Sequence, residues 1–243
     1  MGEIKMAGIG TLVNGAAVII GGLIGILCKR GLSQRFQDII MQANGLAVIF
    51  IGITGALEKM ITVSGNSIST EGTIMATICL TVGAILGEAI DIDEKFERFG
   101  AWLKARAGRQ KDSKFIDGFI TTTLIVCVGA MGIVGSIEDA LSHDPSMLFT
   151  KALLDGIIVV VLAAGFGVGA IFSVIPLLIF QGTLTLFAGA VEPFMTEMMI
   201  NNISMIGSML VFCVGANLFL NAKIKVANLL PALLTVIVYT ILV

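Results

Sequence analysis

Eight large polar side chains stand inside long apolar runs of this sequence, and they are the residues that could bind a small solute or an ion. They are Asn14, Asn44, Glu88, Asp117, Asp155, Gln181, Asn202 and Asn217. A polar group without a partner is unstable in hydrocarbon, so such side chains usually face one another or a water-filled cavity. We take all of them except Asn202 as candidate ligands of a solute or ion.

Asp155 is the carboxylate best suited to coupling, because Glu88 and Asp117 lie nearer the inner ends of their apolar runs and could reach headgroup water. A carboxylate deeper in the membrane can exchange a proton for a cation, or stay neutral and donate a hydrogen bond. Simple solvation of Asp155 at the outer mouth of the protein is an equally good interpretation.

The sequence carries no pattern typical of an enzyme or of a nucleic-acid-binding protein. Its only histidine, His143, lies in a polar loop, and its four cysteines lack the C-x-x-C spacing of zinc and redox sites. A nucleophile elbow, a zinc-protease motif and a phosphate-binding loop are all missing. We therefore expect no catalysis, no cofactor, no metal site and no nucleic-acid partner.

Two polar elements occur twice in the same order. LVNG at residues 12–15 is echoed by LLDG at 153–156, which pairs Asn14 with Asp155, and Asn44 is matched by Gln181, each followed by glycine. This pattern predicts an internal duplication with two polar levels near its axis. The alternative is that the amides are interhelical hydrogen-bond partners, each contributing about 0.6 to 2 kcal/mol.

The composition places these residues in a membrane protein. The chain is 56% hydrophobic and 13% charged, with a mean hydropathy of +1.01, whereas soluble domains carry about 25% charged residues. Apolar runs of about twenty residues, each able to cross a bilayer, recur along the whole length. The predicted fold is an all-α polytopic membrane protein with eight transmembrane helices, at residues 8–28, 39–57, 73–90, 115–136, 152–172, 175–191, 200–220 and 226–243.

The long segment 91–114 is the exception, because it holds seven basic and five acidic residues. Its residues Phe96, Phe99 and Trp102 recur at three-residue steps, which predicts an amphipathic helix at the headgroup level. A solvated connector helix is the alternative. We divide the chain into a first half, residues 1–114, and a second part, residues 115–243, that contains the second repeat at 150–221.

The distribution of Lys and Arg orients the predicted spans. With the amino terminus outside, the inner loops hold Lys29, Arg30, Arg35, Lys223, Lys225 and the seven basic residues of 91–114, and the outer side keeps only Lys5, Lys59 and Lys151. Both termini are then extracytoplasmic. Four spans separate the matched elements, so both copies point the same way and the predicted repeat is parallel.

Glycines spaced for close helix packing are frequent among the 29 in the chain. On the first span, Asn14, Gly21 and Gly25 fall on one helical face, which can pack closely and still present an amide. The residues that we assign to packing or hinges are Gly21, Gly25, Gly45, Gly52, Gly83, Gly87, Gly182 and Gly189.

Three segments resemble the YqgA/YdfK-type family of uncharacterised bacterial inner-membrane proteins. They read GIGTLVNGAAVIIGGLIGILCKRGLSQRFQDIIMQANGLAVIFIGITGALE, CVGAMGIVGSIEDAL and LIFQGTLTLFAG, and the resemblance covers essentially the whole chain. It implies a multi-pass protein of the bacterial inner membrane. The family carries the general label of transporter, without a defined substrate or mechanism.

The sequence therefore predicts a transporter of a small solute or ion, with a polar site between two internal repeats and the lipid bilayer as its surroundings. The alternatives are a channel or facilitator, and a membrane scaffold or accessory subunit that transports nothing. A homo-oligomer is compatible with each. Transport predicts a wet cavity lined by the duplicated amides, whereas a scaffold predicts that all of them are consumed by interhelical bonds.

The predicted orientation can be tested by labelling thiols on intact cells. In a cysteine-free background, Arg109→Cys should not react with a membrane-impermeant reagent, because residues 91–114 face the cytoplasm. His143→Cys, in a loop predicted to lie outside, is the control and should react. Labelling at position 109 without labelling at position 143 would show that the orientation is the reverse of the predicted one.

Overall fold

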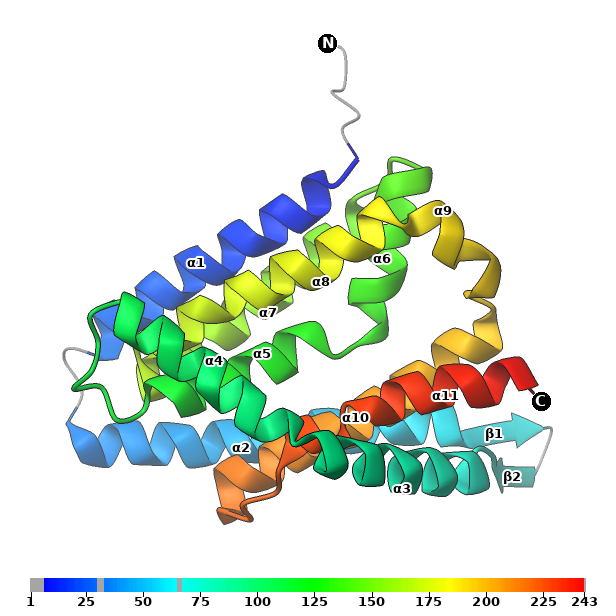
Figure 1. The fold of residues 1–243 in the computed structure, drawn as a ribbon, viewed down its shortest axis with the longest axis horizontal. Coiled ribbons are helices and arrows are strands. Elements are labelled where there is room, and N and C mark those ends of the chain that lie inside the picture. Colours follow the sequence, from blue (N-terminus) through cyan, green and yellow to red (C-terminus); the bar gives the residue numbers. More distant parts are fainter. Residues whose placement is uncertain (1–6, 30–32, 65–66, 243) are drawn as a thin grey trace, which may run out of the picture. The chain divides into compact units, whose positions relative to one another are not determined.

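The computed structural model describes residues 7–29, 33–64 and 67–242, and almost all of its elements are helices (Figure 1). In chain order they are α1 (Ile9–Lys29), α2 (Gln34–Met60), β1 (Ile61–Ser64), β2 (Ser67–Thr70), α3 (Thr73–Ile90), α4 (Ile92–Arg106), α5 (Phe115–Cys127), α6 (Ala130–Leu141), α7 (Ser146–Phe166), η1 (Val168–Ser173), α8 (Val174–Leu186), α9 (Ala188–Val191), η2 (Glu192–Phe194), α10 (Glu197–Leu220), η3 (Val226–Leu229) and α11 (Pro231–Leu242). Two basic residues used to orient the chain, Lys5 and Arg30, lie outside the described residues.

Six of these helical segments are long and apolar enough to span a membrane, and α5 and α6 form a bent pair that would make a seventh if the pair crosses as one span. The segment Val226–Leu242 is apolar but shorter. Many large apolar side chains on the outside of these helices are exposed, for example Leu12 at 63% and Leu153 at 67%. Such a surface fits hydrocarbon and not water. The prediction of a helical, multi-span membrane protein is confirmed, but the described residues contain six or seven candidate spans and not the predicted eight.

The sequence prediction was wrong about where the fifth span begins. We placed its start at residue 152, with Lys151 in an outer loop, but α7 begins at Ser146 and Lys151 is a buried residue within it. The lysine does not end the helix because its ammonium group is paired with Asp155, one turn further along.

Two further features differ from the prediction. The predicted fourth span is not one continuous helix, because α5 ends at Cys127 and the chain resumes as a helix after a bend of 59°. The polar segment before α3 contains a β-hairpin, in which Ile61 pairs with Thr70 and Val63 with Ile68. The β-branched residues of both strands favour this extended conformation.

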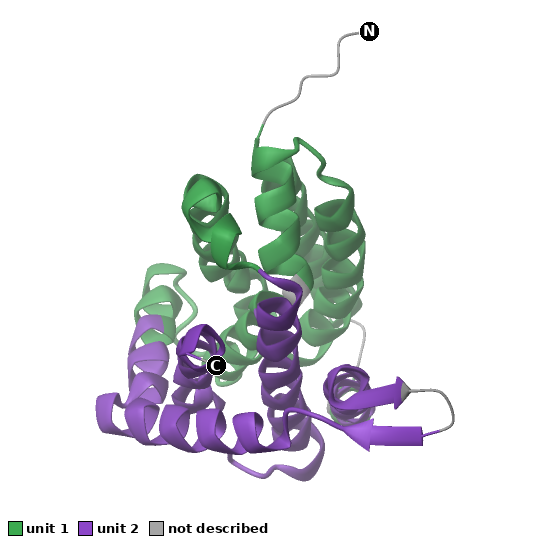
Figure 2. Cartoon of the chain, turned by 90° about the vertical axis from the view of Figure 1, so that its right-hand side faces the viewer, with its two compact units in different colours: residues 1–40, 100–127, 131–195 green, residues 41–99, 128–130, 196–243 purple. Residues whose placement is uncertain are grey.

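The chain folds into two compact units, coloured separately in Figure 2. Unit 1 comprises residues 1–40, 100–127 and 131–195, and unit 2 comprises residues 41–99, 128–130 and 196–243. Each unit therefore draws segments from both of the halves that we predicted.

In unit 1, α1 packs along α7 with both helices running in the same direction (Figure 1). A Cβ atom at Gly21 would collide with the carbonyl of Gly156, and a Cβ at Gly25 would collide with that of Val160. The contact thus repeats after four residues on both helices and in the same order, as expected for parallel helices. Only glycine lets the two backbones approach so closely.

In unit 2, glycines also define the helix contacts, but the helices run in opposite directions. Gly83 and Gly87 of α3 face Ala232 and Asn228, respectively, near the start of α11. On α2, Gly45 and Gly52 lie against α10 in the same antiparallel manner. If every predicted span crosses the membrane, the first and fifth spans should run parallel, and the second and seventh, like the third and eighth, should run antiparallel. The glycine contacts have these directions.

Gly182 and Gly189 do not share this packing, because a Cβ at either would meet nothing within 4 Å. This contrast provides a matched test. Gly21→Ala should destabilise the protein by about 1 to 3 kcal/mol, since the new methyl group meets a backbone carbonyl that cannot give way. Gly182→Ala should be neutral or stabilising by up to about 1 kcal/mol, because alanine favours a helix.

The measurement is the midpoint of thermal unfolding of each purified variant in the same detergent. Equal midpoints for the two variants would show that the α1–α7 contact is looser than the structure indicates.

Candidate functional site

A cluster of buried polar side chains lies where α1 crosses α7 in unit 1. Asn14 donates a hydrogen bond through Nδ2 to Asp155 Oδ2 at 3.0 Å, and Lys151 Nζ donates to the same oxygen at 2.6 Å. The exposed fractions are 0% for Asn14, 4% for Asp155 and 7% for Lys151. A carboxylate, an ammonium group and an amide are therefore held together away from solvent.

The end of α5 completes the surroundings of the ammonium group. Lys151 Nζ also donates to the carbonyl oxygen of Val126 at 2.8 Å. Because α5 ends at Cys127, this carbonyl lies in its last turn, where backbone oxygens have no partner within the helix. The helix C-terminus also carries about half a negative charge. The break between α5 and α6 thus supplies a backbone oxygen that a continuous helix would use itself.

Gln181 on α8 adds an amide that is fully buried. Neither its oxygen nor its nitrogen has a hydrogen-bond partner among the described residues, and the same holds for the Oδ1 atom of Asn14. A Cβ atom at Gly132 would stand 3.3 Å from Cε of Lys151 and 3.6 Å from Nε2 of Gln181, so both side chains adjoin the same glycine. We call Asn14, Lys151, Asp155, Gln181 and the Val126 carbonyl the polar cluster.

A second buried carboxylate in unit 1, Asp139 of α6, has a different environment. Its Oδ2 atom accepts a hydrogen bond from the backbone N–H of Gly10 at 2.9 Å. Gly10 is in the first turn of α1, where backbone donors lack helical partners and the dipole favours a negative charge. Asp139 therefore caps α1 and attaches α6 to it.

The remaining predicted residues lie elsewhere. Asn44 belongs to α2 in unit 2, where its Nδ2 atom is buried and none of the residues that the structure describes binds it. Asp117, near the start of α5, is exposed. Asn217 pairs both of its amide atoms with the backbone of Ile224, each at 2.7 Å, and so fixes the turn that follows α10.

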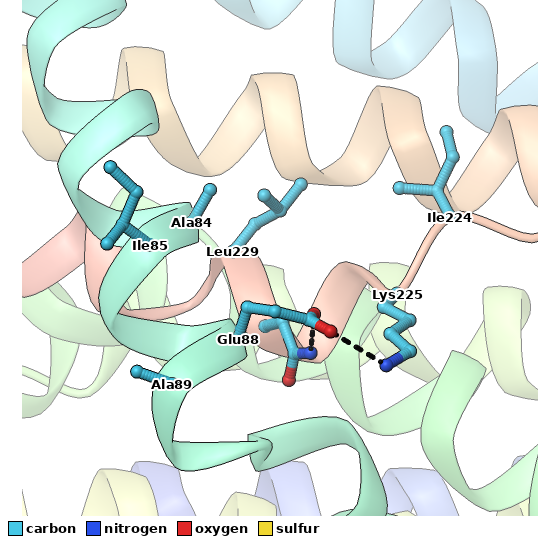
Figure 3. Close-up of a pocket in the computed structure, with 8 residues that line it drawn as sticks. Ala84, Ile85, Glu88, Ala89, Ile224, Lys225 and Leu229 are labelled. Carbon is cyan, nitrogen blue, oxygen red and sulfur yellow. Dashed lines mark hydrogen bonds and ion pairs between the residues drawn. The ribbon is translucent and has the colours of Figure 1, made fainter.

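Glu88 lies at an exposed corner of unit 2, beside a hollow of about 630 Å³ (Figure 3). It accepts hydrogen bonds from Lys225 at 3.1 Å and from Asn228 at 2.7 Å. Hydrogen bonding to Glu88, together with the charge of Asp91, raises the pKa of Lys225. Asn228 also accepts from the backbone N–H of Asp93. These groups satisfy one another and hold α3, α4 and η3 together, which is a structural role.

Sequence reasoning missed Lys151, Asp139 and the Val126 carbonyl. The spacing of Lys151 and Asp155, four residues apart in an apolar helix, was a usable signal, because it places both on one face. Asp139 follows an apolar stretch that we had ended at residue 136. The carbonyl could not be found, since nothing in the side chains of residues 124–127 indicates that the helix stops there.

Helices of membrane-spanning length around buried charged groups define this molecule as a multi-span integral membrane protein. Residues 9–241 match the family model described as "Protein of unknown function (DUF554)", and the chain belongs to that family. This confirms the resemblance that the sequence indicated.

Two curated relatives are similar over nearly the whole chain. The protein named "Uncharacterized membrane protein YdfK" of Bacillus subtilis (strain 168) is 32% identical over 225 residues, which is 93% of this chain and 92% of that relative. "Uncharacterized protein YqgA" of Escherichia coli (strain K12) is 29% identical over 230 residues, 93% of each chain. No solved structure matches the chain.

The cap on α1 leads to a stability prediction. Asp139→Ala should lower the free energy of unfolding by about 1 to 2 kcal/mol, because it removes both a buried hydrogen bond and a charge at a helix N-terminus. Glu138→Ala, at the half-buried neighbouring position, is the control and should change it by less than about 0.5 kcal/mol. Thermal unfolding in detergent measures both, and a larger loss at position 138 would contradict the role of Asp139.

Proposed function

We propose that this protein transports a small solute or an ion across the bacterial inner membrane, and that it is not an enzyme. The polar cluster supports this proposal, above all the amide of Gln181, which is buried with both polar atoms unpaired. Charged side chains inside a membrane protein are costly and commonly mark the path of a substrate or ion. Amide atoms without partners, next to a charged pair, are suited to binding a transported solute or ion.

A purely structural role explains the cluster less well. A scaffold would use its amides as Asn217 is used, with donor and acceptor both occupied. Gln181 contributes no such bond in the described structure, and Asn14 contributes only through its nitrogen. An unpaired buried amide costs about 1 to 3 kcal/mol for each polar group, which a scaffold has no reason to retain.

The broken helix also favours transport. In many transporters the site is formed by discontinuous helices, whose free backbone carbonyls bind ions near the middle of the membrane. The α5–α6 break supplies such a carbonyl at Val126, in contact with the charged side chain of Lys151.

We further propose that α1 and α7 begin two parallel repeats. The matched residues Asn14 and Asp155 come from these helices, which run in the same direction and contact each other. In this proposal the first helices of both copies form the site, both termini are extracytoplasmic, and residues 91–114 face the cytoplasm.

The proposal can be tested by the reactivity of a thiol at position 181. In a background without native cysteines, Gln181→Cys should react with small water-soluble thiosulfonate reagents in native membranes, because a transport site must open to water. Leu177→Cys is the matched control, since Leu177 lies one turn earlier on α8 and is equally buried at 0%. It should not react.

Reactivity from both faces, in right-side-out and inverted vesicles, is the result expected of a transporter. A thiol at position 181 that is as unreactive as one at position 177 would show a closed helix contact and support the scaffold. If the reagent reaches position 181 from both faces of the membrane at the same time, the result would support a channel.

A further inference from the structure

The geometry points to a binding site for a monovalent alkali cation in the polar cluster, which the ammonium group of Lys151 fills and from which sodium or potassium can displace it. This inference deepens the proposed function, because it names the class of ion that the same site would take. It begins with the atoms around Lys151 Nζ.

Those atoms are oxygens of the kinds that bind hard cations. Asp155 Oδ2 lies 2.6 Å from Nζ, and the carbonyl oxygen of Val126 lies 2.8 Å from it. Carboxylates, backbone carbonyls and amide oxygens are the ligands that such ions prefer. Lys151 therefore occupies a position that already has the chemistry of a cation site.

Two amide oxygens of the polar cluster have no hydrogen-bond partner among the described residues. Asn14 reaches the same carboxylate through its nitrogen, and its Oδ1 atom is buried without a partner. Gln181 Oε1 is likewise buried and has no partner in the described part of the chain, and the Nε2 atom of the same amide adjoins Gly132 together with Lys151. An ammonium group can donate only three hydrogen bonds, whereas a metal ion at the same place can draw in more oxygen ligands.

Charge balance limits the cation to a single positive charge. With Lys151 in place, its charge and that of Asp155 cancel. When Lys151 moves out of the cluster, one carboxylate charge and the negative end of α5 remain. A monovalent ion carries the same charge as the ammonium group that it replaces and so leaves the local charge unchanged, while a divalent ion would add one more positive charge in a buried place.

Lysine is suited to act as a competitor because its charge is carried on a flexible four-carbon stem. Lys151 Cε lies beside Gly132, at the start of α6, where the absence of a side chain leaves room for the stem to change direction. The cation and the ammonium group would thus exclude each other. Entry of the ion displaces the lysine, and return of the lysine expels the ion.

The decisive experiment compares three forms of the purified full-length protein in detergent. Lys151→Met keeps an unbranched side chain but leaves Asp155 without its ammonium partner. The double variant Lys151→Met/Asp155→Asn removes the carboxylate charge as well. Wild type retains both charges. Each is heated in N-methylglucamine chloride, sodium chloride or potassium chloride at equal ionic strength and at a fixed pH.

We expect sodium or potassium at about 100 mM to raise the unfolding midpoint of Lys151→Met by roughly 3 °C or more, because an ion that binds only the folded state stabilises it. Wild type should shift by less than half as much, since Lys151 competes. The double variant should not respond. Equilibrium dialysis with radioactive sodium should show binding to wild type that Asp155→Asn loses, and this measurement does not depend on the folding of Lys151→Met.

Other outcomes overturn the inference. If acidification stabilises Lys151→Met but neither cation does, Asp155 takes a proton and the site is not a cation site. Equal shifts in all three forms would indicate a general salt effect. The proposed function is judged separately by the thiol at position 181: sodium binding with an unreactive thiol would reject transport alone, and a reactive thiol without sodium binding would reject the cation alone.

Discussion

Polar groups inside a bilayer must find their partners within the protein, and the carboxylate of Asp155 meets this constraint where α1 crosses α7. Glycines on α1 let its backbone reach that of α7, so that side chains as short as asparagine and aspartate can touch. The close contact and the polar cluster thus depend on each other. Without Gly21 the helices would stand further apart, and Asp155 would lose the partner that α1 contributes.

Stability alone does not account for a charged pair in this position. Replacing a buried ion pair by apolar residues of similar volume is often neutral or stabilising, while removing one partner costs about 3 to 5 kcal/mol. Lys151 and Asp155 are therefore each required once the other is present, but the pair is not needed to hold α7 in the fold. The same region tolerates an unpaired glutamine, which lowers stability further. These two features are the basis of the proposal that unit 1 holds a transport site.

Much of this organisation could be predicted from the sequence, because hydropathy and glycine spacing depend on local physics. The start of α3 at Thr73 and the end of α10 at Leu220 were predicted to the residue. Lys151 was misplaced because counting charges assigns lysines to loops, and only the partner on the next turn reveals that one can be buried. The bend after Cys127 was not predicted, because no proline lies near it in the sequence. The repeat, in turn, stays a prediction.

The candidate site was predicted only in part. Asn14 and Asp155 were paired as equivalent positions of two repeats, and the structure brings the two side chains into direct contact. Asn217 could not be separated from them by sequence, because its role depends on the backbone of Ile224, which follows an unpredictable turn. From the sequence alone, an amide in an apolar helix that binds a backbone segment cannot be distinguished from one that could bind a ligand.

The two buried carboxylates of unit 1 show why the chemistry belongs to Asp155. Asp139 accepts from the backbone of α1, and such a bond can change only if a helix end moves. Asp155 accepts from the side chains of Lys151 and Asn14, which can change rotamer while every helix stays in place. Asp139 therefore holds α6 on α1, close to the helix break whose Val126 carbonyl accepts from Lys151. The bonds that side-chain rotation alone can exchange lie at Asp155, which is why the proposed cation site is centred on this carboxylate.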